Sequence, residues 1–218
     1  MNKIKSTVSR RDFLGIAGAA GIAGVLIACN KNDSMGMSQG VDLGSGDVGI
    51  LNYAYALEQL EAAFYIQVAA NPYSGISALE SSYFSDIRDH EIAHREFFKK
   101  ALGSNAIQDL EPDFSAINFS SRDSVLATAK AFEDLGVSAY NGAGKLLTNP
   151  TCLLLAGKIV SVEARHAAAI RDLISYNSFA DNTVIDMNGL DKSRTPSEVL
   201  AIAGSFIKTK INASNLPM

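Results

Sequence analysis

Apolar residues recur at alternating steps of three and four along most of residues 47–176. This spacing is typical of helices that bury one face against a core. The pattern predicts four long helices, over 47–70, 76–102, 120–147 and 149–176. The first two and the last two are separated by short turns, whereas residues 103–120 form one long connection. We therefore expect an all-α four-helix bundle, residues 47–176, with a single crossover and no strand.

The chain beyond the bundle, residues 177–218, reads as a C-terminal extension. Residues 177–194 show no periodicity. Thr195 and Glu198 then form the spacing of a capping box, in which each end of the pair hydrogen-bonds the backbone at the other. We expect a short fifth helix that begins there and ends near Lys208.

Two polar pairs interrupt the apolar faces of the second and fourth helices. Glu91 and His94 are three residues apart, as are Glu163 and His166. On a helix, residues with this spacing project from the same face. An unpaired carboxylate in such a face would cost several kcal/mol or take up a proton. Bound metal ions are the compensation that these residue types favour.

An internal repeat supplies two more acidic residues. Residues 57–65 align with residues 132–140, which pairs Glu58 with Glu133 and Tyr65 with Tyr140. Glu61 lies one turn beyond Glu58 and is an alternative to it, but Glu61 aligns with Gly136. The repeat therefore favours Glu58. Each half of the chain provides one lone Glu and one Glu-x-x-His.

These residues make a candidate set of six metal ligands: Glu58, Glu91, His94, Glu133, Glu163 and His166. Four carboxylates with neutral imidazoles carry a charge of −4, which two divalent cations would cancel. Oxygen-rich sites with one imidazole per metal suit Fe or Mn better than Zn. The simplest assignment has Glu91 and Glu163 bridging two metals, with Glu58/His94 and Glu133/His166 as the terminal pairs.

Three neighbouring residues have weaker roles in this prediction. Tyr65 and Tyr140 lie two turns from the lone glutamates. They are either core aromatic residues or hydrogen-bond partners of the carboxylates. His90 precedes Glu91 and points about 100° away from it on a helix, which indicates a partly exposed polar residue.

The ligand pattern resembles the ferritin-like superfamily of di-iron and di-manganese carboxylate proteins. It also resembles the exported ferritin-like domain proteins that include the desiccation-related group. The resemblance implies an oxidoreductase acting on oxygen, peroxide or ferrous iron. A metal-binding or stress-protective scaffold without turnover is the alternative. Ile92 and Ala164 follow the two core glutamates, so no Met is placed there to hold a haem.

The N-terminus carries an export signature. The segment Ser9-Arg10-Arg11-Asp12-Phe13-Leu14 resembles a twin-arginine motif, and sixteen uncharged residues follow from Phe13 to Ala28. A stable membrane span needs about 20 apolar residues. Leu26-Ile27-Ala28-Cys29 resembles a lipobox. We expect a signal peptide over 1–28, a lipid on Cys29 and a flexible tether over 29–46. An uncleaved anchor helix is the alternative, and both place the protein at a membrane in the cell envelope or periplasm.

Composition adds limits rather than a function. The chain has 218 residues and a formal charge of −4, with no basic stripe, which argues against nucleic acid as a partner. Two cysteines exclude a disulfide framework. The sequence leaves the oligomeric state open.

Overall fold

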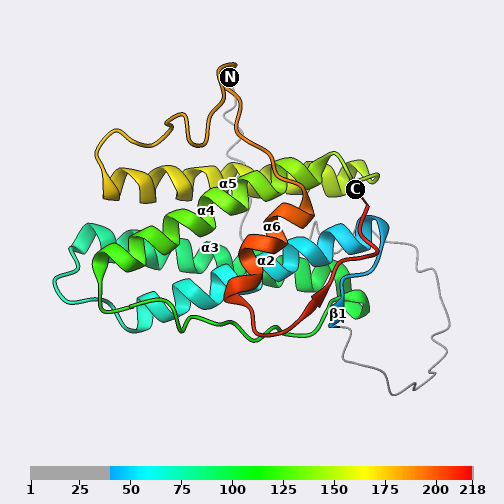
Figure 1. Cartoon of the computed structure of the whole chain (residues 1–218), viewed down its shortest axis with the longest axis horizontal. Coiled ribbons are helices and arrows are strands. Elements are labelled where there is room, and N and C mark those ends of the chain that lie inside the picture. The colour runs from blue at the N-terminus through cyan, green and yellow to red at the C-terminus, as the bar shows by residue number, and fades with distance from the viewer. Residues whose placement is uncertain (1–39, 218) are drawn as a thin grey trace, which may run out of the picture. The chain divides into compact units, whose positions relative to one another are not determined.

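The computed structural model describes residues 40–217. Four long helices form a bundle, and a short helix lies outside it (Figure 1). The bundle helices are α2 (Gly46–Ala70), α3 (Ala78–Leu102), α4 (Arg122–Gly144) and α5 (Pro150–Ile174). The short helix is α6 (Pro196–Ala203). The predicted all-α bundle with one crossover and a fifth helix is confirmed.

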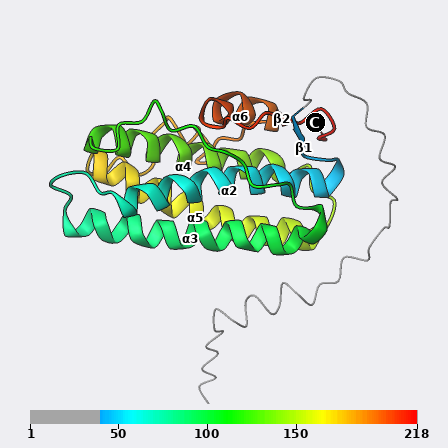
Figure 2. The same cartoon turned by 90° about the horizontal axis from the view of Figure 1, so that it is seen from below.

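The four helices pack in two layers, α2 with α4 and α3 with α5, and α6 covers the α2/α4 layer (Figure 2). Helices adjacent in sequence, α2 with α3 and α4 with α5, make the most extensive contacts. Helix α2 is the most deeply enclosed, since every residue from Gly49 to Ala62 is buried. A helix that is buried on all sides needs few polar residues. The polar residues that α2 does carry therefore need a role.

Most helix starts follow the predicted caps. Ser121 accepts a hydrogen bond from the backbone N–H of Ser124 at the start of α4, and Asn149 caps α5 just before Pro150. Thr195 and Glu198 form the predicted capping box of α6. Ser77 and Glu80 form a second capping box, which starts α3 two residues after the predicted position.

Two helices end earlier than their apolar periodicity predicts. Helix α4 stops at Gly144, three residues before Leu147, because Asp47 of α2 accepts the backbone N–H groups of Thr148 and Asn149 and draws the chain into a turn. Helix α6 gives way to a single 3₁₀ turn, η2 (Gly204–Phe206). Lys208 was expected in that helix but donates its backbone N–H to Glu111 of the crossover.

Two polar residues of α2 hold the crossover along the bundle. The crossover begins with a 3₁₀ turn, η1 (Gly103–Asn105). The buried Asn52 donates to the carbonyls of Leu43 and Asn105 and accepts the N–H of Ile107. Gln59, two turns further along α2, accepts the N–H of Leu110. These bonds satisfy backbone groups of the crossover where it runs along α2, so the connection is ordered despite its length.

The first described residues are part of the domain. Strand β1 (Val41–Asp42) pairs in parallel with β2 (Ile211–Asn212), and the side chain of Leu43 is fully buried. Residues 40–46 therefore do not belong to the flexible tether that was predicted over 29–46. The two strands were not expected, because two residues are too few to show alternation. The predicted signal peptide, Cys29 and tether residues 30–39 lie outside the described residues.

The described part of the chain contains no helix that is both long enough and apolar enough to cross a membrane.

Glu80 joins three helix ends near one end of the bundle. Its carboxylate accepts from the backbone N–H and the hydroxyl of Ser77, and its second oxygen lies 2.6 Å from Nε of Arg122. Arg122 also donates to the carbonyl of Leu173 near the end of α5. Burial alone would raise the pKa of Glu80, but the hydrogen bonds from Ser77 and Arg122 lower it to about 2.

We expect Glu80→Gln to lower the free energy of unfolding at pH 7 by about 1–2 kcal/mol, a value reduced for the solvent around the half-exposed Arg122. The pKa is lower in the folded state, so the stabilisation is present above the reference pKa of 4.5 and is lost as the pH falls toward 2. Urea unfolding at several pH values measures this. Glu96→Gln, at an exposed site of α3, is the control. A difference between wild type and Glu80→Gln that stays constant down to pH 3 would contradict the assignment.

Candidate metal centre

Each of the four bundle helices contributes one fully buried glutamate to the centre of the bundle. Glu58 comes from α2, Glu91 from α3, Glu133 from α4 and Glu163 from α5. His94 and His166 lie one turn after the glutamates of α3 and α5. The structure brings all six predicted residues together in two overlapping groups, which share Glu91 and Glu163.

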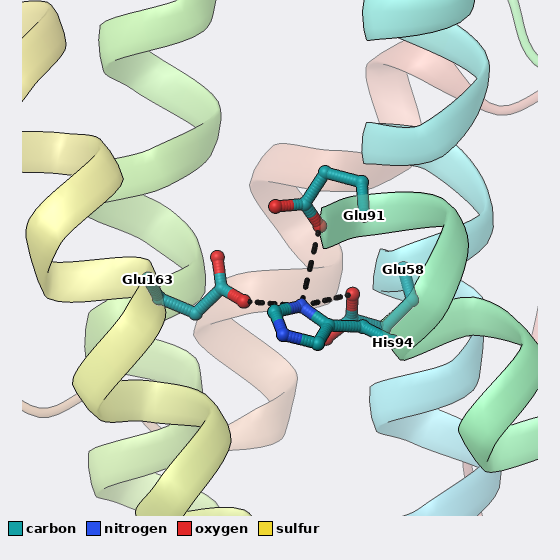
Figure 3. Close-up of side chains that lie close together, drawn as sticks. All are labelled: Glu58, Glu91, His94 and Glu163. Atoms are coloured by element: carbon teal, nitrogen blue, oxygen red, sulfur yellow. Dashed lines mark ion pairs between the residues drawn. The ribbon is translucent and has the colours of Figure 1, made fainter. Parts of the chain in front are cut away.

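The first group surrounds Nδ1 of His94 (Figure 3). This nitrogen lies 2.8 Å from Glu163 Oε1, 3.4 Å from Glu58 Oε2 and 3.7 Å from Glu91 Oε2. The three carboxylates reach it from three different helices. Figure 3 shows them converging on the imidazole from different sides.

The second group repeats this arrangement around His166. Its Nδ1 lies 3.0 Å from Glu91 Oε1, 3.5 Å from Glu133 Oε2 and 3.6 Å from Glu163 Oε2. Glu91 and Glu163 therefore each direct one oxygen toward His94 and the other toward His166. Glu58 belongs to the first group alone and Glu133 to the second alone.

The converging atoms are suited to cations. Glu91 and Glu163 have both carboxylate oxygens buried without a hydrogen-bond partner, although these oxygens lie close to the histidine nitrogens. Nδ1 of each histidine is likewise buried and without a hydrogen-bond partner. Buried polar atoms of folded proteins are normally hydrogen-bonded, so a set of exceptions at one point needs an explanation. Two divalent cations would satisfy these atoms and neutralise four carboxylates.

The outer oxygens of the two unshared glutamates are held by tyrosines. Tyr65 of α2 donates its hydroxyl to Glu133 Oε1 at 2.5 Å, and Tyr140 of α4 donates to Glu58 Oε1. Both tyrosines are buried, as their predicted role requires. Each helix of the α2/α4 layer thus orients the carboxylate of the other. One oxygen of Glu58 and one of Glu133 remain directed at the centre.

In the absence of a cation, the pKa values of the cluster favour protonated histidines that offset the charge of the carboxylates. Burial alone would lower the pKa of His166, but the charge of Glu133 and the contacts with Glu163 and Glu91 raise it to about 12. The pKa of His94 is also raised, against the effect of burial, chiefly by Glu58. The two histidines in turn lower the pKa of Glu163 to about 2, although burial opposes this.

The other shared glutamate behaves differently. Burial and the charge of Glu163 raise the pKa of Glu91 well above its usual value, and burial raises that of Glu133 to about 7. Without a cation, the centre therefore keeps protons on both imidazoles and on part of its carboxylates. Protons and metal ions compete for the same atoms.

Glu61 is a buried carboxyl group outside both ligand groups. A Cβ atom added at Gly136 of α4 would lie 3.1 Å from Glu61 Oε1, so the glycine leaves room for this side chain. Burial, followed by the charges of Glu91, Glu163 and Glu133, raises the pKa of Glu61. The structure thus places Glu58 in the cluster, as the repeat predicts, and leaves Glu61 outside it as a buried carboxyl group with a raised pKa.

His90 has a contact that the sequence did not predict. It is exposed over part of its surface, as expected, but its Nδ1 lies 2.9 Å from Nε2 of His166. The only signal in the sequence was its position next to Glu91. Its position in the sequence does not predict which neighbouring helix its side chain contacts.

A cavity of about 700 Å³ lies away from the cluster, between the end of α4, helix α6 and the C-terminal segment, and none of the six cluster residues lines it. The cluster itself is enclosed, with the side chains of His94 and His166 only 12% and 5% exposed. The six candidate metal ligands therefore lie in the interior of the bundle and not in this cavity.

Comparison with known proteins agrees with this geometry. A search of curated proteins finds no significant match to the sequence. The model of the ferritin-like domain family matches residues 46–176, which is more than half of the chain and covers all four bundle helices. The match contains every residue of the cluster. The chain therefore belongs to the ferritin-like domain family.

Proposed function

We propose that this protein binds two Fe or Mn ions and acts as an oxidoreductase on oxygen, peroxide or ferrous iron. The observation that carries the proposal is the orientation of Glu91 and Glu163, each with one oxygen toward each histidine. Two carboxylates in this orientation suit a pair of cations that share them. Glu58 with His94, and Glu133 with His166, would complete the two positions.

The donor set supports Fe or Mn. It combines four carboxylates with one imidazole per position, whereas Zn favours tetrahedral sites richer in nitrogen and sulfur. The charge of −4 matches two divalent ions. When bound, such a pair supplies electrons for the reduction of oxygen or peroxide.

The protein's own residues would position and shield this centre. Tyr65 and Tyr140 hold the unshared carboxylates in place through their hydroxyl groups. The ring of Tyr65 packs near Phe84 and that of Tyr140 near Phe98, and these buried aromatic residues exclude water from the cluster. Burial and the charges of the neighbouring glutamates raise the pKa of Glu61 in the same core, which favours the protonated form of this carboxyl group.

Glu91→Gln and Glu163→Gln test the proposal. We expect the wild-type chain to bind two Mn(II) or Fe(II) ions and each variant to lose at least tenfold in affinity at both positions, because each removes a shared carboxylate. Saturating metal should stabilise the wild type by about 2.7 kcal/mol per ion at a concentration 100 times Kd, which for two ions is about 5.4 kcal/mol or roughly 10–20 °C in Tm. Calorimetry and thermal unfolding measure these values.

Oxygen and peroxide consumption, measured against free-metal controls, then tests turnover. Glu96→Gln is the matched control on α3, because its carboxylate is exposed and belongs to neither ligand group. Turnover that persists in folded Glu91→Gln protein would contradict the proposed centre. Metal binding without any consumption would instead favour the stress-protective scaffold.

Metal loading should release protons. The raised pKa values of His94 and His166 keep both imidazoles protonated near neutral pH, and a ligand nitrogen must lose that proton. We expect at least about two protons per loaded chain, one from each imidazole, and an affinity that rises with pH from 6 to 8. Calorimetry in buffers of different ionisation enthalpy counts these protons. A pH-independent affinity with no proton release would rule out this account.

We also propose that the protein is exported by the twin-arginine route and anchored by a lipid on Cys29. The support is the sequence of residues 9–29 alone. A route that carries folded proteins would allow the metals to be bound before export.

Cys29→Ala should move the protein from the membrane fraction to the soluble fraction, since it removes the acceptor of the lipid. The pair Arg10→Lys and Arg11→Lys should leave the precursor inside the cell. Fractionation with immunoblotting and mass spectrometry of the mature N-terminus measure both effects. A membrane-bound Cys29→Ala protein with an intact N-terminus would favour the uncleaved anchor helix.

A further inference from the structure

His90 and His166 join helices α3 and α5 at the edge of the metal centre. Nδ1 of His90 lies 2.9 Å from Nε2 of His166, the ring centroids are 5.2 Å apart, and the ring planes differ by 9°. The centroid distance exceeds the nitrogen distance by about two imidazole radii. The rings therefore lie end to end in nearly one plane, which is the arrangement of a linear hydrogen bond rather than of face-to-face stacking.

The direction of this hydrogen bond follows from the other nitrogen of His166. Its Nδ1 faces the carboxylates of Glu91, Glu133 and Glu163, so Nδ1 is the atom available to a metal. A neutral imidazole that binds through Nδ1 keeps its proton on Nε2. Nε2–H of His166 then donates to Nδ1 of His90, and the proton of His90 lies on its own Nε2.

His90 is suited to accept this bond. Its Nδ1 lies 2.9 Å from Nε2 of His166, and a neutral imidazole with its proton on Nε2 has a free acceptor nitrogen at Nδ1. Nε2 of His166 carries the donated proton both when Nδ1 binds a metal and when the ring is protonated.

The other half of the centre lacks this contact. In the internal repeat, Glu91 aligns with Glu163, so the position equivalent to His90 is Val162. Valine cannot accept a hydrogen bond. Within residues 40–217, no side chain hydrogen-bonds Nε2 of His94, and the side chain of His94 is 12% exposed against 5% for His166. The two metal positions have matching ligands, but in the described part of the chain only the ligand histidine His166 has a hydrogen-bond acceptor behind it.

We propose that His90 is a positioning residue that fixes the proton of His166 on Nε2 and makes the Glu133/His166 position the tighter of the two. This inference rests on the proposed metal centre. A hydrogen-bond acceptor behind a ligand histidine orients the ring and raises its basicity, and its loss typically costs 10–100-fold in metal affinity. The first ion would thus occupy the Glu133/His166 position. The Glu58/His94 position would hold the ion that exchanges more readily.

The test is an Mn(II) titration of the purified full chain, with free Mn(II) followed by electron paramagnetic resonance. We expect wild type to bind two ions in two distinct steps. Glu133→Gln should remove the tight step, and Glu58→Gln the weak one. His90→Val, which copies the residue of the other half, should weaken the tight step 10–100-fold and leave the weak step unchanged. His90→Gln keeps an acceptor oxygen and should restore much of the affinity.

A second measurement separates positioning from a general structural effect. In protein loaded with diamagnetic Zn(II), proton–nitrogen NMR should show a protected Nε2–H on His166 in wild type and an exchanging one in His90→Val. Two steps of unchanged affinity in a folded His90→Val protein would overturn the inference. Loss of the tight binding step in the Glu58→Gln variant would also overturn the inference. Absence of both Mn(II) and Fe(II) binding in wild type would overturn the metal centre itself, a result distinct from either of these.

Discussion

Four ionisable carboxyl groups meet in a core that excludes water, and their compensation is the constraint on which the rest of the structure depends. One group comes from each bundle helix, so no helix can shift along the bundle without removing a carboxylate from the others. A single ionised carboxylate left unpaired there would cost several kcal/mol. The same constraint that aligns the helices also assembles the six converging side chains. The fold and the candidate metal centre therefore have one physical origin.

The tyrosines show how this alignment is maintained. Tyr65 bonds Glu133 and Tyr140 bonds Glu58, so α2 and α4 each provide the hydroxyl group for the carboxylate of the other. Such reciprocal contacts require the two helices to run in opposite directions. The long crossover makes this possible, because it returns the chain along the bundle before α4 begins. Asn52 and Gln59 hold it against α2 on the way.

Much of this could be predicted from the sequence, because both the helices and the cluster depend on periodicity within one segment. The buried faces of α3 and α5 show the 3.6-residue period, and Glu91 and Glu163 stand out against it. Features that depend on contacts between segments could not be predicted. The end of α4 is set by Asp47 from another helix. His90 points to the flank of α3, and only the packing of α5 against that flank gives it a partner.

Glu61 and Gly136 occupy equivalent positions in the two halves, yet they face each other. Two residues that face their own counterpart lie close to the pseudo-twofold axis that relates the halves. A dimer of identical helix pairs would have to place the same residue on both sides of that axis, either two acids or two glycines. A single chain that contains both halves can place one acid there and leave space opposite. With two helix pairs in one polypeptide, a single acid can lie on the axis. A symmetric dimer of helix pairs would have to place two there.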